Sequence, residues 1–191
     1  GVPVSQMFIP NGEALQLSVN GDGPVVAAIV ANPAEVVSVA TFPTGFVGGE
    51  VLDVRVLGMD QSVTFEPGDQ TIGDVVARLN AQLTLVRVDE VAGQIRIRTD
   101  LGGTNAHLEV TGGDANAVLA FPTSTSLGSG NVGLAAEVTA TEIAAIVMAA
   151  VPGVVADVVD GALRLRTVAT GAGASLQVLA ASSLDERLGF D

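Results

Sequence analysis

The chain contains no cysteine, lysine, tryptophan or tyrosine, and its single histidine is His107. Without cysteine, neither disulfide bonds nor thiolate metal sites can form. Without tryptophan and tyrosine, the aromatic stacking by which proteins bind single-stranded nucleic acids is not expected. A catalytic triad or a histidine metal site would need partners for His107 that the sequence does not supply. We therefore expect a protein that is not an enzyme and that uses no metal and no cofactor.

Positive charge is also scarce. The 191 residues include eight arginines against 21 acidic residues, which gives a formal net charge of -13. Such a field repels duplex nucleic acid and anionic membranes, and it favours solubility or contact with a basic neighbour. The longest uncharged apolar stretch, residues 143–156, is too short to span a bilayer. We expect no nucleic-acid partner, no membrane insertion and no small-molecule substrate.

The chain repeats itself at an offset of 68 residues. Residues 93–110 and 161–178 are identical at eight of 18 positions. The match continues upstream without a gap to Thr71 and Thr139, and downstream, with one inserted residue, to a phenylalanine near the end of each copy. A period of this length indicates a duplicated supersecondary unit or small domain.

The first copy is expected to form an α+β module over residues 49–122. Alternating apolar residues predict a strand over residues 50–57 and a hairpin partner over residues 61–66. Thr71 has the position of a helix N-cap, with Asp74 three residues later. The expected apolar face of the helix consists of Ile72, Val75, Val76, Leu79 and Leu83. The strands expected after the helix cover residues 84–90, 94–99 and 106–111.

The second copy is expected over residues 133–191, after a linker rich in serine, threonine and glycine at residues 123–132. Thr139 and Glu142 repeat the capping pattern, and Pro152 ends the helix. A clear leading hairpin is missing from this copy. The expected apolar face of its helix consists of Ile143, Ile146, Val147, Ala150 and Val151. Its expected strands cover residues 154–159, 163–167 and 175–179.

Residues 1–48 are expected to form a β-rich N-terminal element. Residues 12–19 match residues 49–56 in pattern, so this element offers a candidate for the missing hairpin. Residues 32–35 fit either a helix start with Pro33 at the first position or a strand, and the valines that follow favour the strand. The expected fold class is α+β, with this element followed by two tandem related modules, each a small antiparallel sheet packed on one helix.

A β-hairpin, a capped amphipathic helix and a strand pair carrying Gly-x-Ile/Leu-x-Ile/Leu-x-Thr follow one another in this order. The residues concerned are 52–54, 71–81 and 93–99, with 161–167 in the second copy, where Met148 stands in the place of Asn80. This arrangement resembles the flagellin hook IN motif of flagellar hook-associated and filament-cap proteins, which also has similar forms in phage and phage-tail-like virion proteins. The resemblance implies an exported or virion-borne structural module of a polymeric assembly, without catalytic residues. The long heptad-bearing termini of the flagellar proteins are missing, which favours a virion.

Three acidic turns are further candidates for a ligand site. Residues 20–23, 66–69 and 112–116 each offer oxygen atoms that suit calcium, but none has the spacing of an EF-hand or a glycine-rich nonapeptide loop. Turn chemistry explains all three, and a weak calcium site stays open. Paired carboxylates for glycoside hydrolysis also stay open, although a sugar cleft without tryptophan or tyrosine would be unusual.

Two Arg-x-Arg pairs are a more specific feature. Arg96, Arg98, Arg164 and Arg166 are half of the chain's cations and occupy equivalent strand positions. In so acidic a chain they are a candidate subunit interface, which would dock carboxylates of a neighbouring copy through bidentate contacts. The alternative is a row that is solvated or paired within its own chain.

The sequence therefore favours a non-enzymatic structural subunit of a phage or phage-tail-like particle, in its tail, neck or surface decoration. Such a subunit assembles into a homo-oligomeric array, with copies of itself and other particle proteins as partners. Its expected location is the virion or an extracellular appendage. The alternative is a bacterial surface adhesin or a flagellar hook-associated or cap-like binding module.

Overall fold

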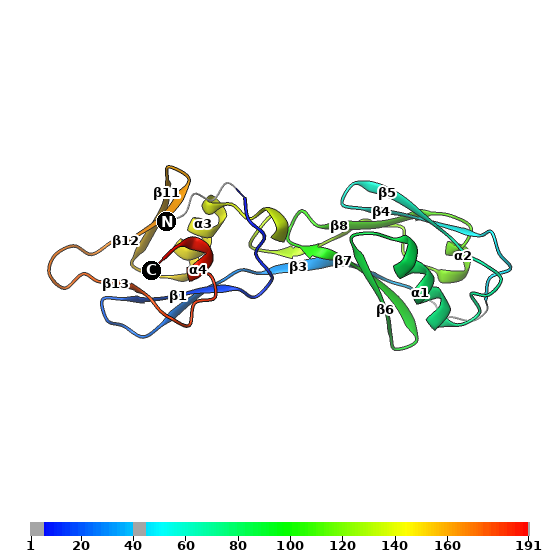
Figure 1. The fold of residues 1–191 in the computed structure, drawn as a ribbon, viewed down its shortest axis with the longest axis horizontal. Helices are drawn as coiled ribbons and strands as arrows, with labels where there is room; N and C mark the ends of the chain where they lie inside the picture. Colours follow the sequence, from blue (N-terminus) through cyan, green and yellow to red (C-terminus); the bar gives the residue numbers. More distant parts are fainter. Residues whose placement is uncertain (1–5, 40–44, 191) are drawn as a thin grey trace. The chain divides into compact units, whose positions relative to one another are not determined.

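The computed structural model describes residues 6–39 and 45–190, and the chain divides into two compact units. Unit 1 comprises Gly1–Ala31 and Gly130–Asp191, and unit 2 comprises Asn32–Ser129 (Figure 1). The fold is a β-rich α+β arrangement with four small antiparallel sheets and few helices, which confirms the α+β class. The expected N-terminal element, residues 1–48, is shared between the two units because the chain passes into unit 2 after Ala31.

Unit 2 contains a β-hairpin, a helix, a second hairpin and a returning strand, in that order. The returning strand pairs with the leading strand of the first hairpin, which therefore lies between two antiparallel neighbours. The second hairpin pairs with an earlier strand of the chain. In chain order the elements are β3 (Ala31–Val37), β4 (Val51–Val56), β5 (Met59–Thr64), α1 (Ile72–Gln82), β6 (Val86–Val91), β7 (Gln94–Gly102), β8 (His107–Gly112), α2 (Asn116–Leu119), β9 (Ser126–Leu127) and β10 (Ser129–Gly130).

Unit 1 has the same order of elements, but its first hairpin comes from the N-terminal segment and the rest from the C-terminal segment. The leading strand of that hairpin again lies between its hairpin partner and the returning strand. The second hairpin forms a two-stranded sheet. In chain order the elements are β1 (Ala14–Val19), β2 (Val25–Ala28), the 3-10 helix η1 (Ala135–Glu137), α3 (Ala140–Ala150), β11 (Val154–Val159), β12 (Ala162–Thr167), β13 (Leu176–Val178) and α4 (Asp185–Leu188).

The same backbone hydrogen bonds recur at equivalent places in the two units. Leu57 N donates to His107 O over 3.0 Å in unit 2, and Asn20 N donates to Ser175 O over 2.8 Å in unit 1. β1 therefore occupies in unit 1 the place that β4 occupies in unit 2. Two further equivalent pairs of bonds are Asp100 N to Leu85 O with Val168 N to Gly153 O, and Ala106 N to Gly103 O with Ala174 N to Gly171 O.

Both long helices begin at the capping boxes that the sequence predicts. Thr71 Oγ1 accepts a bond of 3.2 Å from Asp74 N, and the Asp74 carboxylate accepts one of 2.9 Å from Thr71 N. Thr139 and Glu142 form the same pair, with distances of 3.2 and 2.8 Å. Since each box satisfies backbone donors that have no partner within the helix, it fixes where the helix starts. α3 ends at Ala150, shortly before Pro152.

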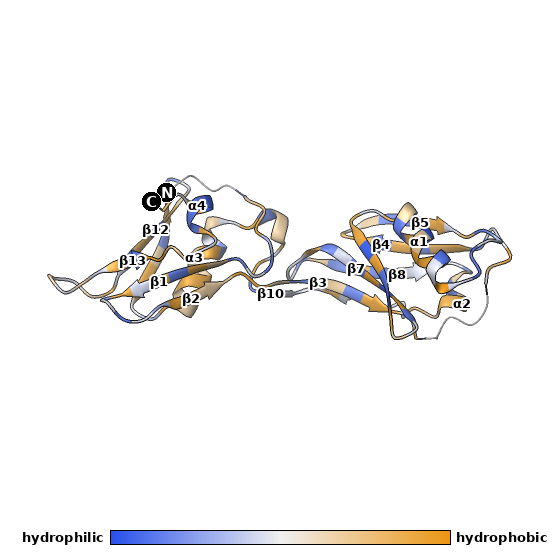
Figure 2. Ribbon diagram, turned by 60° about the horizontal axis from the view of Figure 1, so that its bottom comes forward, coloured by the Kyte–Doolittle hydropathy of each residue, from blue (hydrophilic) through white to orange (hydrophobic). Residues whose placement is uncertain are grey.

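The helices bury the centre of the predicted apolar faces. Val75 and Leu79 of α1 are fully buried, whereas Ile72 and Val76 are half-buried. In α3, Ile143 and Val147 are buried within the unit 1 core, and Ile146 is buried with them. The leading strands β1 and β4 both alternate between buried and half-buried residues, and hydrophobic and hydrophilic positions alternate along the strands in Figure 2. Each unit thus has its own core between a helix and small sheets.

The strand reading of residues 32–35 is correct. These residues lie inside β3, which pairs antiparallel with β7. Pro33 lies where the register shifts, so its missing backbone donor leaves no gap in a regular ladder. Val36 is 3% exposed, and burial of a β-branched residue against the sheet favours the strand over a helix start. Residues 40–42 of the same run lie outside the described residues.

Aspartate in place of a fully buried helix residue should destabilise its unit. Leu79→Asp and Val147→Asp should each lower the free energy of unfolding by several kcal/mol, because each places an uncompensated charge in a packed core. Urea denaturation followed by circular dichroism measures the change. The exposed Ala77→Asp and Met148→Asp serve as matched controls on the same helices and should stay close to wild type. Equal stability of a core variant and its control would show that the helix face is wrongly placed.

Candidate interaction surface

The four arginines predicted as a subunit interface lie on β7 and β12, and each forms an ion pair within its own hairpin. In unit 2, Arg96 binds Asp89 through two bonds of 2.8 Å, from Nε to Oδ1 and from Nη2 to Oδ2. Arg98 Nη2 donates to Asp89 Oδ2 over 2.8 Å. One carboxylate therefore accepts a bidentate pair of bonds from Arg96 and a single bond from Arg98. We call these three residues the unit 2 cluster.

Unit 1 repeats this arrangement. Arg164 Nε donates to Asp157 Oδ1 over 2.8 Å, and its Nη2 donates to Asp157 Oδ2 over 2.7 Å. Arg166 Nη2 reaches the same Oδ2 over 3.2 Å. We call these residues the unit 1 cluster. The structure thus brings the four arginines together two by two, each pair around an aspartate of its own chain; whether they also form a subunit interface stays a prediction.

Two short turns place the aspartates opposite the arginines. Ala92 and Gly93 have φ of 53° and 79° between β6 and β7, as in a type I′ turn, and this pairs Val91 with Gln94 and Asp89 with Arg96. The same turn between β11 and β12 pairs Asp157 with Arg164. The sequence-based reasoning missed both aspartates as arginine partners, although counting outward from a two-residue turn would have found them.

The ion pairs shift the pKa values of Asp89, Arg96, Asp157 and Arg164 in the direction that keeps these groups charged. The hydrogen bond from Arg96, with the charges of Arg98 and Arg96, outweighs partial burial and holds the pKa of Asp89 below its ordinary value. The hydrogen bond from Arg164 does the same to the pKa of Asp157. In turn, the Asp89 carboxylate raises the pKa of Arg96. At neutral pH both aspartates and their bidentate arginine partners are therefore ionised.

The two clusters differ in what surrounds them. In unit 2, Glu35 of β3 approaches Arg96, with 3.6 Å between Oε2 and Nη1. The side chains of Arg96 and Arg98 are 24% and 29% exposed, whereas those of Arg164 and Arg166 are 54% and 59% exposed. The formal charges of the unit 2 cluster and Glu35 cancel, and Arg87, opposite Arg98 on β6, adds a positive charge beside them. The unit 1 cluster keeps one excess positive charge in an otherwise acidic chain.

The acidic turns serve as local hydrogen-bond acceptors. Asp69 is 5% exposed, and its Oδ2 accepts a hydrogen bond of 3.1 Å from Arg78 Nε. Asp114 Oδ1 accepts a bond of 2.6 Å from Val51 N. In the third turn, Asp22 accepts a bond from Ser18 through its backbone oxygen. His107 is half-buried on β8, with Nδ1 at 3.1 Å from Asn105 O. Over residues 6–39 and 45–190, no group of three or more histidine, cysteine or acidic side chains is arranged to hold a metal ion.

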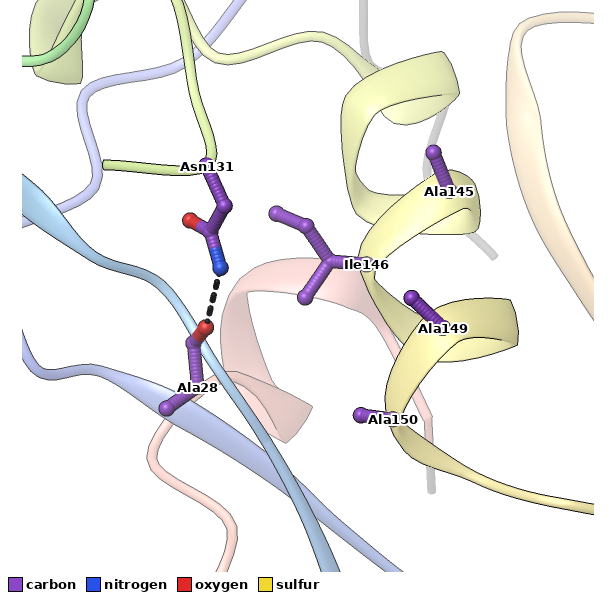
Figure 3. A pocket seen from close by; sticks show the side chains of 6 residues that line it. All are labelled: Ala28, Asn131, Ala145, Ile146, Ala149 and Ala150. Atoms are coloured by element: carbon purple, nitrogen blue, oxygen red, sulfur yellow. Dashed lines mark hydrogen bonds between the residues drawn. The ribbon is translucent and has the colours of Figure 1, made fainter. Parts of the chain in front are cut away.

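A shallow groove of about 360 Å³ lies in unit 1, lined mainly by small apolar residues of α3. Asn131 faces it from the opposite side, and its Nδ2 donates to Ala28 O over 2.8 Å (Figure 3). The Asn131 Oδ1 atom accepts a bond of 2.8 Å from Val30 N, so the amide is occupied at both ends. The groove therefore offers apolar contact and few polar groups with which to orient a ligand. Its residues are Ala28, Asn131, Ala145, Ile146, Ala149 and Ala150.

No protein-family model matches the chain, and no curated protein matches it. In the part of the chain that the structure describes, no helix has the length and apolar character needed to cross a membrane.

Removing the carboxylate of the unit 2 cluster should weaken the fold at neutral pH but not in acid. Asp89→Asn should lower the free energy of unfolding by about 1 kcal/mol at pH 7, a value reduced for solvent because the side chain is 32% exposed. Since the folded-state pKa lies below the ordinary 3.8, the stabilisation is present above that value and is lost as the pH falls through the folded-state pKa. Urea midpoints across the acid range measure it.

Glu90→Gln, at the neighbouring exposed position, is the matched control and should behave as wild type. If the difference between Asp89→Asn and wild type persisted well below pH 3.8, the ion pair would not be its cause.

Proposed function

We propose that the protein is a non-enzymatic structural subunit of a phage or phage-tail-like particle, in its tail, neck or surface decoration. Copies associate in a homo-oligomeric array, in contact with other particle proteins. The observation that carries the proposal is the repetition of one hydrogen-bonding framework in both units, down to the caps, the turns and the aspartate–arginine clusters. The features that recur in both units are structural ones, and the resemblance to hook IN modules also supports a structural role.

We also propose that the two units are related modules, each a helix packed with small antiparallel sheets, and that they derive from one ancestral unit by duplication. Their arrangement is an insertion, because unit 2 enters unit 1 between β2 and α3. The module of unit 1 is completed by β1 and β2, so the missing leading hairpin of the second copy is the N-terminal one. Insertion of a whole domain is tolerated where the ends of the inserted domain lie close together.

The arginine clusters are the candidate contacts between subunits. Subunits that each carry a charge of -13 repel one another, so association needs local pairing of cations with carboxylates. The exposed Arg164 and Arg166 are better placed to supply it than Arg96 and Arg98, which Asp89 and Glu35 already neutralise.

Replacing the four arginines with glutamine should leave the chain folded while weakening association in a salt-sensitive way. Circular dichroism checks the fold, and incorporation into particles, with sedimentation at several salt concentrations, measures the association. Of the two double variants, R164Q/R166Q should account for most of the loss, and R96Q/R98Q is its matched counterpart in unit 2. Normal incorporation of the fourfold variant would contradict the role of the arginines.

The alternative, a surface adhesin or flagellar cap-like module, differs in what binds. A virion subunit co-purifies with particles at a fixed stoichiometry, and electron microscopy of the native source locates it. An adhesin binds cells or glycans as a free monomer, and that result, without any particle-associated protein, would overturn the proposal.

A further inference from the structure

Among the described strands, the two units differ in strand pairing at the outer edge of β12, and also at β13, which lacks the second partner that β9 gives to β8 in unit 2. In unit 2, β7 has β6 on one side and β3 on the other. In unit 1, the equivalent strand β12 pairs with β11 alone, and no other described strand adjoins it. A sheet edge that carries unpaired backbone donors and acceptors is a template for a further strand.

The backbone groups available at this edge follow from the ladder. Val159 and Ala162 flank the two-residue turn as a hydrogen-bonded pair, and hydrogen-bonded pairs alternate with non-bonded ones in antiparallel sheets. The N–H and C=O groups of Leu163 and Leu165 therefore point away from β11. Their equivalents in unit 2 are Ile95 and Ile97. The outward-facing backbone groups of these two residues pair with β3 and with Ser38, the residue after β3. Ser38 N donates to Ile95 O over 2.8 Å, and Ser38 Oγ accepts a bond of 2.9 Å from Ile95 N.

Coverage by β3 also changes side-chain burial. Ile97 and Thr99 of β7 are 0% and 4% exposed, with Val36 of β3 paired to Ile97 and buried at 3%. The equivalent residues of β12, Leu165 and Thr167, remain half-buried. A strand added at β12 would cover them as β3 covers their counterparts.

We infer that the outer edge of β12 is a docking site for an extended strand of another protein chain that carries a carboxylate opposite Arg166. The occupant adds antiparallel and places an apolar residue opposite Leu165, in the register that Glu35 and Val36 have on β7. Main-chain hydrogen bonds supply affinity, and the alternate side chains supply selectivity, as in other strand-addition complexes.

Charge favours an acidic occupant over a neutral or basic one. The unit 1 cluster has two guanidinium groups and one carboxylate, whereas the unit 2 cluster is completed by the Glu35 carboxylate from the covering strand. The Arg164 and Arg166 side chains are more than half exposed, so a carboxylate can reach them without displacing a buried group. Charged side chains along an edge also discourage pairing with the wrong strands.

The test uses the full chain and a synthetic peptide with the sequence of residues 31–38, which is the covering strand of unit 2. In the free protein, the amides of Leu163 and Leu165 should exchange with solvent at least about a hundredfold faster than those of Ile95 and Ile97, which are the internal control. Addition of the peptide should protect the two leucine amides and leave the isoleucine amides unchanged.

The peptide with Glu35→Lys and the protein variant R164Q/R166Q should each weaken binding about tenfold or more, whereas R55Q, on β4 of unit 2, should not. The protein variants are first checked for wild-type circular dichroism. Peptide binding is measured on the purified chain without particles. A failure of peptide binding would therefore leave the proposed function intact, and a failure of incorporation into particles would leave the strand-binding inference intact.

Three results would overturn the inference. The first is the absence of leucine amide protection at millimolar peptide, and the second is protection that does not depend on the peptide's carboxylate. The third is protection of the same amides in the free protein that grows with protein concentration, which would assign the edge to a second copy of the chain.

Discussion

Unit 1 depends on the pairing of β1 with β13, because these strands bring together the two ends of the chain. Leu17, Ser18 and Val19 pair with Val178, Gln177 and Leu176, and the strands share one core with α3. Between them lies the whole of unit 2, yet the entropy of closing a loop grows only slowly with its length. Unit 2 also holds its own ends near each other, with Asn32 Nδ2 donating to Ser129 Oγ over 3.1 Å. The long insertion therefore costs unit 1 little.

The same local chemistry has different consequences in the two units. The type I′ turn sets an aspartate opposite the first arginine of each Arg-x-Arg pair, so both hairpins carry the same cluster. In unit 2, β3 then closes the edge and adds Glu35, which turns the cluster into an internal feature of a sheet. In unit 1 no described strand pairs with the outer edge of β12, and the cluster lies at this edge with one positive charge in excess.

Much of the fold could be predicted from sequence because its signals are local. The capping boxes at Thr71 and Thr139, the buried faces around Leu79 and Val147, and the turn-flanked strands all follow from spacing and turn chemistry. The pairing of β1 with β13 and the approach of Glu35 to Arg96 could not be predicted in this way. They join residues far apart in sequence, and no local pattern encodes which distant strand a strand edge accepts.

Most of the chain's positive charge is used within the units. Besides the two clusters, Arg55 pairs with Asp60, Arg78 with Glu66 and Asp69, and Arg187 with Glu13. The acidic residues outnumber these cations, so the surface field stays strongly negative and opposes contact between copies. Binding of a strand from another protein depends instead on short-range interactions, and a backbone ladder closed by a charge-assisted side-chain contact is of this kind. In the described part of the chain, the edge of β12 is where such a ladder and excess positive charge coincide.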